Sequence, residues 1–204
     1  MTADDGVVMN PILIVPGLGG SGEGHWQTHL EKSFPGATRV QQDDWDRPEL
    51  GKWVECLTRT AALQRGAILV AHSLGCVVVA HMAARYADLP VAAALLVAPA
   101  DVDSARHTPP HIRGFGPIPL RPLPFYSIVV ASTNDSYITI ERARELADAW
   151  LADFVDAGPV GHINVESGFG RWAEGEGIVN SLTARAAARS GKFRRAVRHA
   201  AGAR

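Results

Sequence analysis

Ser73 lies where the sequence changes from one buried element to another. Residues 68–71 form a short apolar run typical of a parallel strand covered on both faces, and residues 74–85 form an Ala-rich run that favours a buried helix. A serine at such a corner can be a helix N-cap or a nucleophile exposed above the end of a sheet. Ala71 and Gly75 flank it in the pattern of a G-x-S-x-G nucleophile elbow, with alanine in place of the first glycine. We interpret Ser73 as a candidate nucleophile.

A serine nucleophile needs a base to take its proton and an acid to orient that base. Asp101, Asp135 and His162 each follow an expected strand, and the carboxyl ends of parallel strands meet at one edge of a doubly wound sheet. Taken singly, a turn-forming aspartate and a solvated loop histidine are the ordinary explanations. Their joint order after Ser73 predicts His162 as the base. Asp135, in a polar turn one strand before the histidine, is preferred as the acid, and Asp101 stays an alternative.

The glycine-rich loop at residues 17–22 allows two interpretations. It satisfies the G-x-G-x-x-G pattern after a strand, and three aspartates within residues 43–46 follow about 20 residues on, as in a dinucleotide-binding site. Pro16 before the first glycine and Glu23 after the third argue against that function. In the hydrolytic interpretation, a backbone N–H of the loop faces the substrate carbonyl instead.

Two backbone amides are predicted to form the oxyanion hole of such a hydrolase. The N–H of Leu18 comes from the glycine-rich loop, and the N–H of Leu74 opens the helix after Ser73. Removing one donor of this kind costs about 3 kcal/mol of transition-state stabilisation.

Histidines and aromatic residues elsewhere in the chain raise two further possibilities. His25 and His29 have the spacing of a zinc-binding helix, but Trp26 replaces the glutamate of H-E-x-x-H and no third ligand is evident, so we predict no metal. Trp26, Trp45 and Tyr137 are predicted to line an apolar substrate pocket, with core packing as the alternative for each.

The elements that must position these residues follow from hydrophobic patterning. Strands are expected at residues 11–15, 38–41, 68–71, 91–97, 127–131 and 153–157, and helices at 25–34, 50–64, 74–85, 140–150 and from 172 onward. This alternation predicts an α/β fold, a doubly wound and mainly parallel sheet of about six strands with helices on both faces.

Two segments stand apart from that alternation. Residues 104–124 are rich in proline and glycine and are expected to form a rim or lid, because routine connections are shorter. We predict a single domain over residues 1–184 and a basic helix end or tail over residues 185–204, which contains no acidic residue.

Composition excludes several classes of protein. The chain has 204 residues and a net charge of -1, which argues against a general nucleic-acid-binding surface. No apolar run reaches the roughly 18 residues that a membrane span requires. The N-terminus is acidic, unlike a signal peptide, and the two cysteines, Cys56 and Cys76, are expected to be buried free thiols. We therefore expect a cytoplasmic protein without membrane or nucleic-acid contacts.

Five motifs in order resemble those of a known family: residues 15–20 (VPGLGG), 44–45 (DW), 72–75 (HSLG), 134–137 (NDSY) and 161–164 (GHIN). The chain resembles the small α/β-hydrolase-fold serine hydrolases related to retinoblastoma-binding protein 9 and the YdeN-like proteins, over about residues 10–180. The resemblance implies a compact α/β-hydrolase fold and a triad at Ser73, Asp135 and His162.

The resulting hypothesis is a serine hydrolase that cleaves small acyl esters or related acyl compounds through an acyl-enzyme, without metal or cofactor. Ser73 attacks, His162 transfers the proton and Asp135 orients the imidazole. Two alternatives belong to other classes. One is a partner-binding protein with vestigial hydrolase activity, although no Leu-x-Cys-x-Glu motif supports a pocket-protein partner. The other is a nucleotide-binding oxidoreductase that uses the loop at residues 17–22.

Overall fold

Six parallel strands form one sheet at the centre of the molecule. The computed structural model describes residues 10–201, with side chains up to residue 188. The strands are β1 (Ile12–Val15), β2 (Thr38–Arg39), β3 (Ala67–His72), β4 (Val91–Val97), β5 (Tyr126–Ala131) and β6 (Asp153–Asp156). They lie side by side in the order β2-β1-β3-β4-β5-β6. The predicted α/β class is confirmed, although β2 is two residues shorter than expected.

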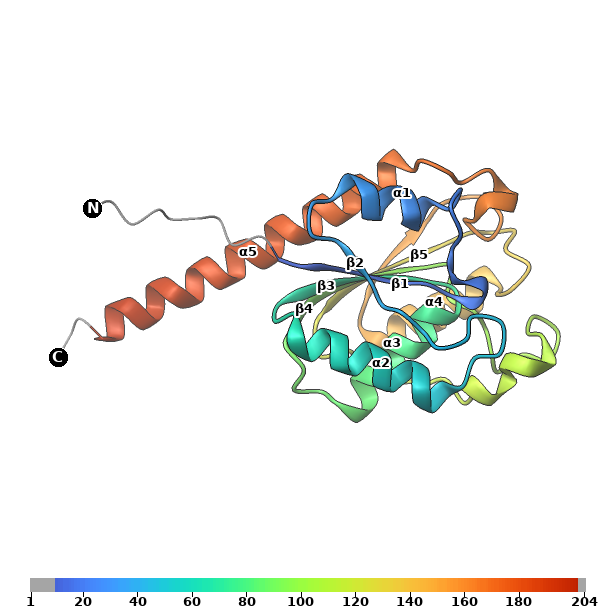
Figure 1. Cartoon of the computed structure of the whole chain (residues 1–204), viewed down its shortest axis with the longest axis horizontal. Helices are drawn as coiled ribbons and strands as arrows, with labels where there is room; N and C mark the ends of the chain where they lie inside the picture. The colour runs from blue at the N-terminus through green and yellow to red at the C-terminus, as the bar shows by residue number, and fades with distance from the viewer. Residues whose placement is uncertain (1–9, 202–204) are drawn as a thin grey trace.

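Helices cover both faces of the sheet (Figure 1). They are α1 (Trp26–Ser33), α2 (Leu50–Leu63), α3 (Leu74–Arg85), α4 (Ile140–Trp150) and α5 (Ala173–Ala201), with short 3₁₀ turns η1 (Leu18–Gly20), η2 (Pro110–Phe115) and η3 (Val165–Ser167). Side chains alternate along each strand, so Leu13 and Val15 face the core under α2, α3 and α4. Ile12 and Ile14 face the second core, under α1 and α5.

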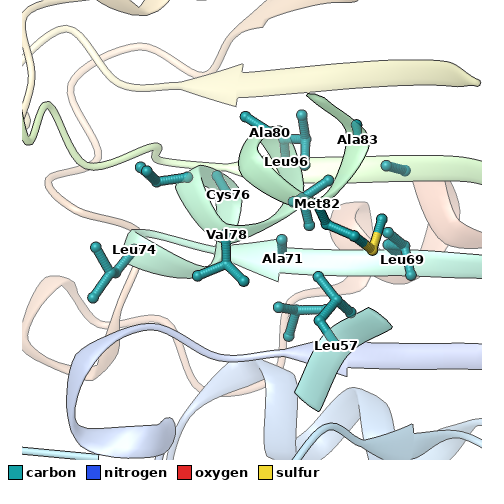
Figure 2. Close-up of a cluster of buried hydrophobic side chains, with 14 of the residues drawn as sticks. Leu57, Leu69, Ala71, Leu74, Cys76, Val78, Ala80, Met82, Ala83 and Leu96 are labelled. Atoms are coloured by element: carbon teal, nitrogen blue, oxygen red, sulfur yellow. The ribbon is translucent and has the colours of Figure 1, made fainter. Parts of the chain in front are cut away.

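The core beneath α3 fixes the helix that follows Ser73. Figure 2 shows Val78 and Met82 of α3 above Leu69 and Ala71 of β3, with Leu57 of α2 beside them, and all five side chains are fully buried. Burying a Val, Leu or Met side chain contributes about 1.5–3 kcal/mol. The elbow is therefore supported by a rigid helix-on-sheet contact.

The order of the strands places a crevice beside the elbow. From β1 the chain moves outward to β2, and it then crosses back to β3 on the other side of β1. The connections after β1 and β3 thus leave on opposite faces, into α1 and α3. Ligands of open α/β sheets bind at the carboxyl ends of strands at such a switch point. The loop at residues 17–22 and Ser73 flank it.

The irregular segment at residues 104–124 is anchored to the core. Ile112 and Phe115 of η2 are buried, and the Phe115 ring packs edge-on against Trp53 at 5.8 Å between centroids. His81 Nε2 donates to the Phe115 carbonyl at 2.7 Å. The segment therefore forms a fixed rim in this structure.

The basic C-terminal segment continues helix α5, which passes residue 184 without a break and extends beyond the sheet (Figure 1). Arg185 lies over the Tyr126 ring, 3.9 Å from its centroid. The basic side chains after residue 188 lie outside the described ones. In the described part of the chain, no helix combines the length and apolar character of a membrane span. Cys56 and Cys76 are buried free thiols, as predicted.

Candidate active site

Ser73 occupies a strained corner between β3 and α3. Its backbone has φ 54° and ψ -122°, a combination that side chains normally avoid. Its N–H donates to the Val97 carbonyl at 3.0 Å and its carbonyl accepts from the Cys76 N–H at 3.0 Å, so neighbouring elements hold the corner. Gly75 lets α3 approach closely, because a Cβ there would lie 2.3 Å from the Val15 carbonyl oxygen. These contacts produce the sharp turn that the elbow pattern predicted.

Ser73, His162 and Asp135 form a continuous chain of hydrogen bonds. The Ser73 Oγ lies 2.9 Å from His162 Nε2. The other ring nitrogen, Nδ1, lies 2.8 and 2.9 Å from the two carboxylate oxygens of Asp135. Because a carboxylate accepts, Nδ1 carries the proton and Nε2 is left to accept from the serine hydroxyl. The Asp135 side chain is fully buried and also accepts from the Tyr137 N–H at 2.8 Å.

Asp101, the alternative acid, contacts other residues. Its carboxylate lies 3.5 Å from Arg142, which also pairs with Asp103 at 2.9 Å. Its backbone carbonyl accepts a hydrogen bond from the Thr108 hydroxyl. Asp101 therefore ties the start of the rim segment to α4, and the structure gives the position beside His162 to Asp135.

Two backbone amides lie free beside Ser73. A Cβ at Gly17 would lie 2.9 Å from Ser73 Cβ and 3.2 Å from the Leu74 nitrogen, so the loop after β1 touches the elbow. Among the described residues, neither the Leu18 N–H nor the Leu74 N–H has a hydrogen-bond partner, since each opens a helical turn. Both predicted donors are thus available at the crevice.

Arg39 supports the loop that carries Leu18. Its guanidinium donates to the carbonyls of Gly20 and Ser21, the latter at 2.8 Å, and pairs with Glu31 at 2.8 Å. The arginine side chain is 13% exposed, which strengthens these charge-assisted bonds. The loop's conformation therefore depends on a residue of β2.

Two buried side chains hold the backbone on either side of Ile163. His72 Nε2 donates to the His162 carbonyl at 3.0 Å, and Trp26 Nε1 donates to the Ile163 carbonyl at 2.9 Å. Ile163 has φ 49°, which a β-branched residue adopts only under constraint. Burial, and then the nearby His162 and His25, hold the pKa of His72 well below its usual value, so His72 is neutral. His72 and Trp26 thus hold the loop at residues 158–163, which carries His162.

Further side chains saturate the same loop. Ser132 Oγ accepts from the Val160 N–H at 3.0 Å, Asn134 Oδ1 accepts from the Gly161 N–H, and Ser167 Oγ accepts from the His162 N–H at 3.0 Å. Sequence reasoning missed these supports. It also missed the support from His72. A polar residue at the buried end of an apolar strand is the signal that could have shown that one.

A cavity of about 290 Å³ opens at Ser73. Its walls are the loop at residues 18–22 with His25, the rim at residues 108–112, Tyr137, and residues 162–166. Tyr137 lines the cavity as predicted.

The prediction for Trp26 and Trp45 is wrong, since neither lines this cavity. Trp26 is 1% exposed and packs edge-on against Trp172 at 5.1 Å between centroids. Trp45 packs against Trp53, 5.5 Å between ring centroids, and its indole lies directly against Gly20. Both indoles contribute to packing behind the site.

Neither the zinc spacing nor the dinucleotide pattern corresponds to a site here. No group of three His, Cys, Asp or Glu side chains in the described part of the chain could hold a metal ion. His25 is the N-cap of α1, its Nδ1 accepting from the Gln27 N–H. In the loop at residues 17–22, the Gly19 N–H is bonded to the Trp45 carbonyl at 3.1 Å, and α1 begins only at Trp26.

A family model described as serine hydrolase matches residues 12–181. The chain belongs to this family. The serine hydrolase fold is also found in a YdeN-like hydrolase from Pectobacterium atrosepticum, 31% identical, with 86% of this chain and 91% of that chain covered and a TM-score of 0.76. The ydeN gene product of Bacillus subtilis is 20% identical over 85% of this chain and 98% of its own, with a TM-score of 0.71. No curated protein matches the chain significantly.

More distant structures share the fold alone. Est1E from Butyrivibrio proteoclasticus, solved with ferulic acid bound, is 12% identical over 90% of this chain and 93% of its own, with a TM-score of 0.64.

The predicted resemblance to YdeN-like serine hydrolases is confirmed. Family membership favours hydrolysis over the dinucleotide interpretation of the loop at residues 17–22.

Proposed function

We propose that this serine hydrolase cleaves small acyl esters or related acyl compounds through a Ser73–His162–Asp135 triad. The observation that carries the proposal is the unbroken hydrogen-bond chain from Ser73 Oγ through the imidazole to a fully buried carboxylate. Ser73 Oγ adds to the acyl carbon as its proton passes to His162 Nε2. The imidazolium then protonates the departing alcohol, which leaves an acyl-serine.

Hydrolysis of the acyl-serine reverses these roles. His162 removes a proton from water as the water oxygen adds to the acyl carbon, and it returns that proton to Ser73 Oγ when the carboxylic acid departs. The Leu18 and Leu74 amides stabilise the oxyanion in both steps. Their lack of other partners in the described residues, and the contact of the loop with Ser73, support this assignment. No metal or cofactor takes part in the proposed reaction.

The size of the cavity supports a small acyl group. Its volume of about 290 Å³ lies near the lower end of the range for ligand pockets, roughly 300–1,000 Å³. The rim at residues 108–112 lines one side of the cavity, and Phe115 in the same 3₁₀ turn as Ile112 ties it to the core. We expect the highest kcat/KM for p-nitrophenyl esters with short acyl chains and a steady decrease as the chain lengthens.

A fluorophosphonate probe tests the nucleophile directly. Labelling followed by peptide mass spectrometry should locate the adduct on Ser73, and Ser73→Ala should abolish it. Asp135→Asn should retain the fold and lower kcat about 10⁴-fold, because the imidazole then favours the wrong tautomer. Asp101→Asn is the matched control, with activity close to wild type. A folded protein whose Ser73 is not labelled would overturn the proposal.

A further inference from the structure

His25 borders the cavity, and its hydrogen bonds determine which of its ring nitrogens carries a proton. Nδ1 accepts from the Gln27 N–H at 3.2 Å, since His25 is the N-cap of α1. The backbone groups of His25 are also occupied, its N–H by the Gly22 carbonyl at 3.0 Å and its carbonyl by the Thr28 N–H at 2.9 Å. A neutral imidazole that accepts at Nδ1 carries its proton at Nε2. His25 is therefore a donor at Nε2.

The ring is neutral and held in place. Burial, and then electrostatic interactions with Arg39 and His162, lower the pKa of His25 to about 4. Its ring packs edge-on against His72, 4.8 Å between centroids. Gln27, whose backbone N–H bonds to the His25 ring, is anchored too, because its side-chain amide donates to the Val70 carbonyl at 2.9 Å. The N–H at Nε2 thus has a fixed direction.

Among the described residues, no hydrogen bond involves His25 Nε2. Within the described part of the chain, Gln42 Oε1 is the one side-chain nitrogen or oxygen that is both fully buried and without a hydrogen-bond partner. His25 Nε2 also has no partner there, so it cannot be fully buried and must be accessible from outside the protein. His25 is only 5% exposed and lines the cavity at Ser73. The space that Nε2 reaches is therefore the cavity.

The other polar groups of the cavity narrow the chemistry of the ligand. Of the described residues that line it, none is Lys or Arg, and Glu166 is its one carboxylate. The site therefore does not attract an anionic substrate by charge. We propose that His25 binds, through Nε2–H, a second oxygen of a neutral acyl substrate, such as an ether, hydroxyl or carbonyl oxygen close to the scissile bond. This inference rests on the proposed hydrolysis at Ser73.

Two substitutions separate the donor at Nε2 from the helix cap at Nδ1. His25→Asn places an amide oxygen where the ring has Nδ1 and has no atom at the position of Nε2, so it keeps the cap and removes the donor. His25→Gln reaches the position of Nε2 with its amide N–H₂ but has no acceptor at the position of Nδ1. It keeps the donor and removes the cap. Circular dichroism and thermal unfolding of both variants report the fold.

The substrates are isosteric ester pairs in which one methylene is replaced by oxygen. p-Nitrophenyl hexanoate is compared with its 3-oxa, 4-oxa and 5-oxa analogues, and hexyl acetate with its 3-oxa and 4-oxa alkyl analogues. For each pair the ratio of kcat/KM, ether over methylene, is measured for wild type and both variants. The intrinsic reactivity of each ester cancels when the ratios of two enzymes are compared.

The proposal predicts that, for at least one pair, the hydrogen bond from His25 raises the kcat/KM of the ether substrate relative to that of the methylene substrate. For that analogue the ratio should fall roughly tenfold in His25→Asn and stay within about twofold of wild type in His25→Gln. Equal ratios in wild type and His25→Asn for every pair would overturn the proposal, as would equal losses in both variants, which would indicate ring packing alone. If fluorophosphonate does not label Ser73 and no ester is cleaved, the proposed function fails and this inference fails with it. Normal labelling with unchanged ratios overturns this inference alone.

Discussion

Replacing Trp26 by phenylalanine tests whether a buried indole positions His162, the proposed base. The substitution removes the donor to the Ile163 carbonyl, a bond of 2.9 Å between residues 137 positions apart in sequence. Ile163 is fully buried and has φ 49°. Without the indole N–H, the Ile163 carbonyl has no partner among the described residues, and the Ile163 backbone can relax toward a common conformation. His162 is the adjacent residue, so the relaxation moves the imidazole.

Two terms contribute to the expected loss of stability. An unsatisfied buried carbonyl costs about 1–3 kcal/mol. The smaller phenyl ring leaves a gap beside Trp172 and His72, whose rings lie 5.1 and 5.9 Å from the indole centroid, and such a gap adds about 1 kcal/mol. Relaxation of Ile163 returns part of this, because a strained residue costs about 1–3 kcal/mol. We expect the free energy of unfolding in urea to fall by about 2 kcal/mol.

The effect on catalysis should be larger than the effect on binding. Trp26 does not line the cavity, so KM should change less than twofold. A displacement of about 1 Å can cost about 100-fold in rate, so kcat should fall between 10-fold and 100-fold. Trp172→Phe is the control, because Trp172 packs against Trp26 and, among the described residues, its side chain makes no hydrogen bond to residues 158–163. An unchanged kcat in Trp26→Phe, or an equal fall in Trp172→Phe, would refute the positioning role.

Three further predictions concern groups around the elbow. The pKa of His25 is about 4 in the folded protein against 6.5 when unfolded, so the unfolded chain binds more protons between these values. The contribution of His25 to the free energy of unfolding is therefore fully present above pH 6.5, and about 3 kcal/mol of it is lost as the pH falls toward 4. Urea unfolding at several pH values should find a smaller decline in His25→Asn. Arg39→Met should lower kcat about tenfold at constant KM, because the loop of Leu18 loses its support. Gly75→Ala should lower the free energy of unfolding by about 3 kcal/mol or more, since its Cβ would meet the Val15 carbonyl.

Each of these has an outcome that contradicts it. The same pH-dependent decline in His25→Asn and wild type would mean that His25 takes up no extra proton on unfolding. An unchanged kcat in Arg39→Met would show that the loop keeps its shape without the guanidinium. For Gly75, the matched change is Ala71→Gly, which alters the other small residue of the elbow by the same methyl group. Equal stability losses at both positions would contradict the close approach of α3 to β1.

Local patterns were sufficient to predict the sheet and the elbow. Strand and helix signals depend on residues close in sequence, and Ala71, Ser73 and Gly75 lie within one turn. The order of Asp135 and His162 after successive strands was also readable, since parallel strands end at one edge. The structural role of the two tryptophans could not be read from the sequence. Trp26 and Trp45 have the composition of pocket residues, and only the packing of α1 and of residues 42–46 shows them behind the site.

How the loop that carries His162, the proposed base, is held in place could not be read from the sequence, for a physical reason. Residues 158–163 form no helix or strand, so several of their backbone groups are bonded by side chains from elsewhere in the chain. Two of those side chains are His72 and Trp26, 90 and 137 residues distant from their partners. His72 is a polar residue at the end of an apolar strand, and Trp26 is a buried indole whose N–H needs an acceptor. Burying either group without a partner is costly. A polar residue at the buried end of a strand therefore predicts that a distant backbone group lies against it, even when the sequence does not say which one.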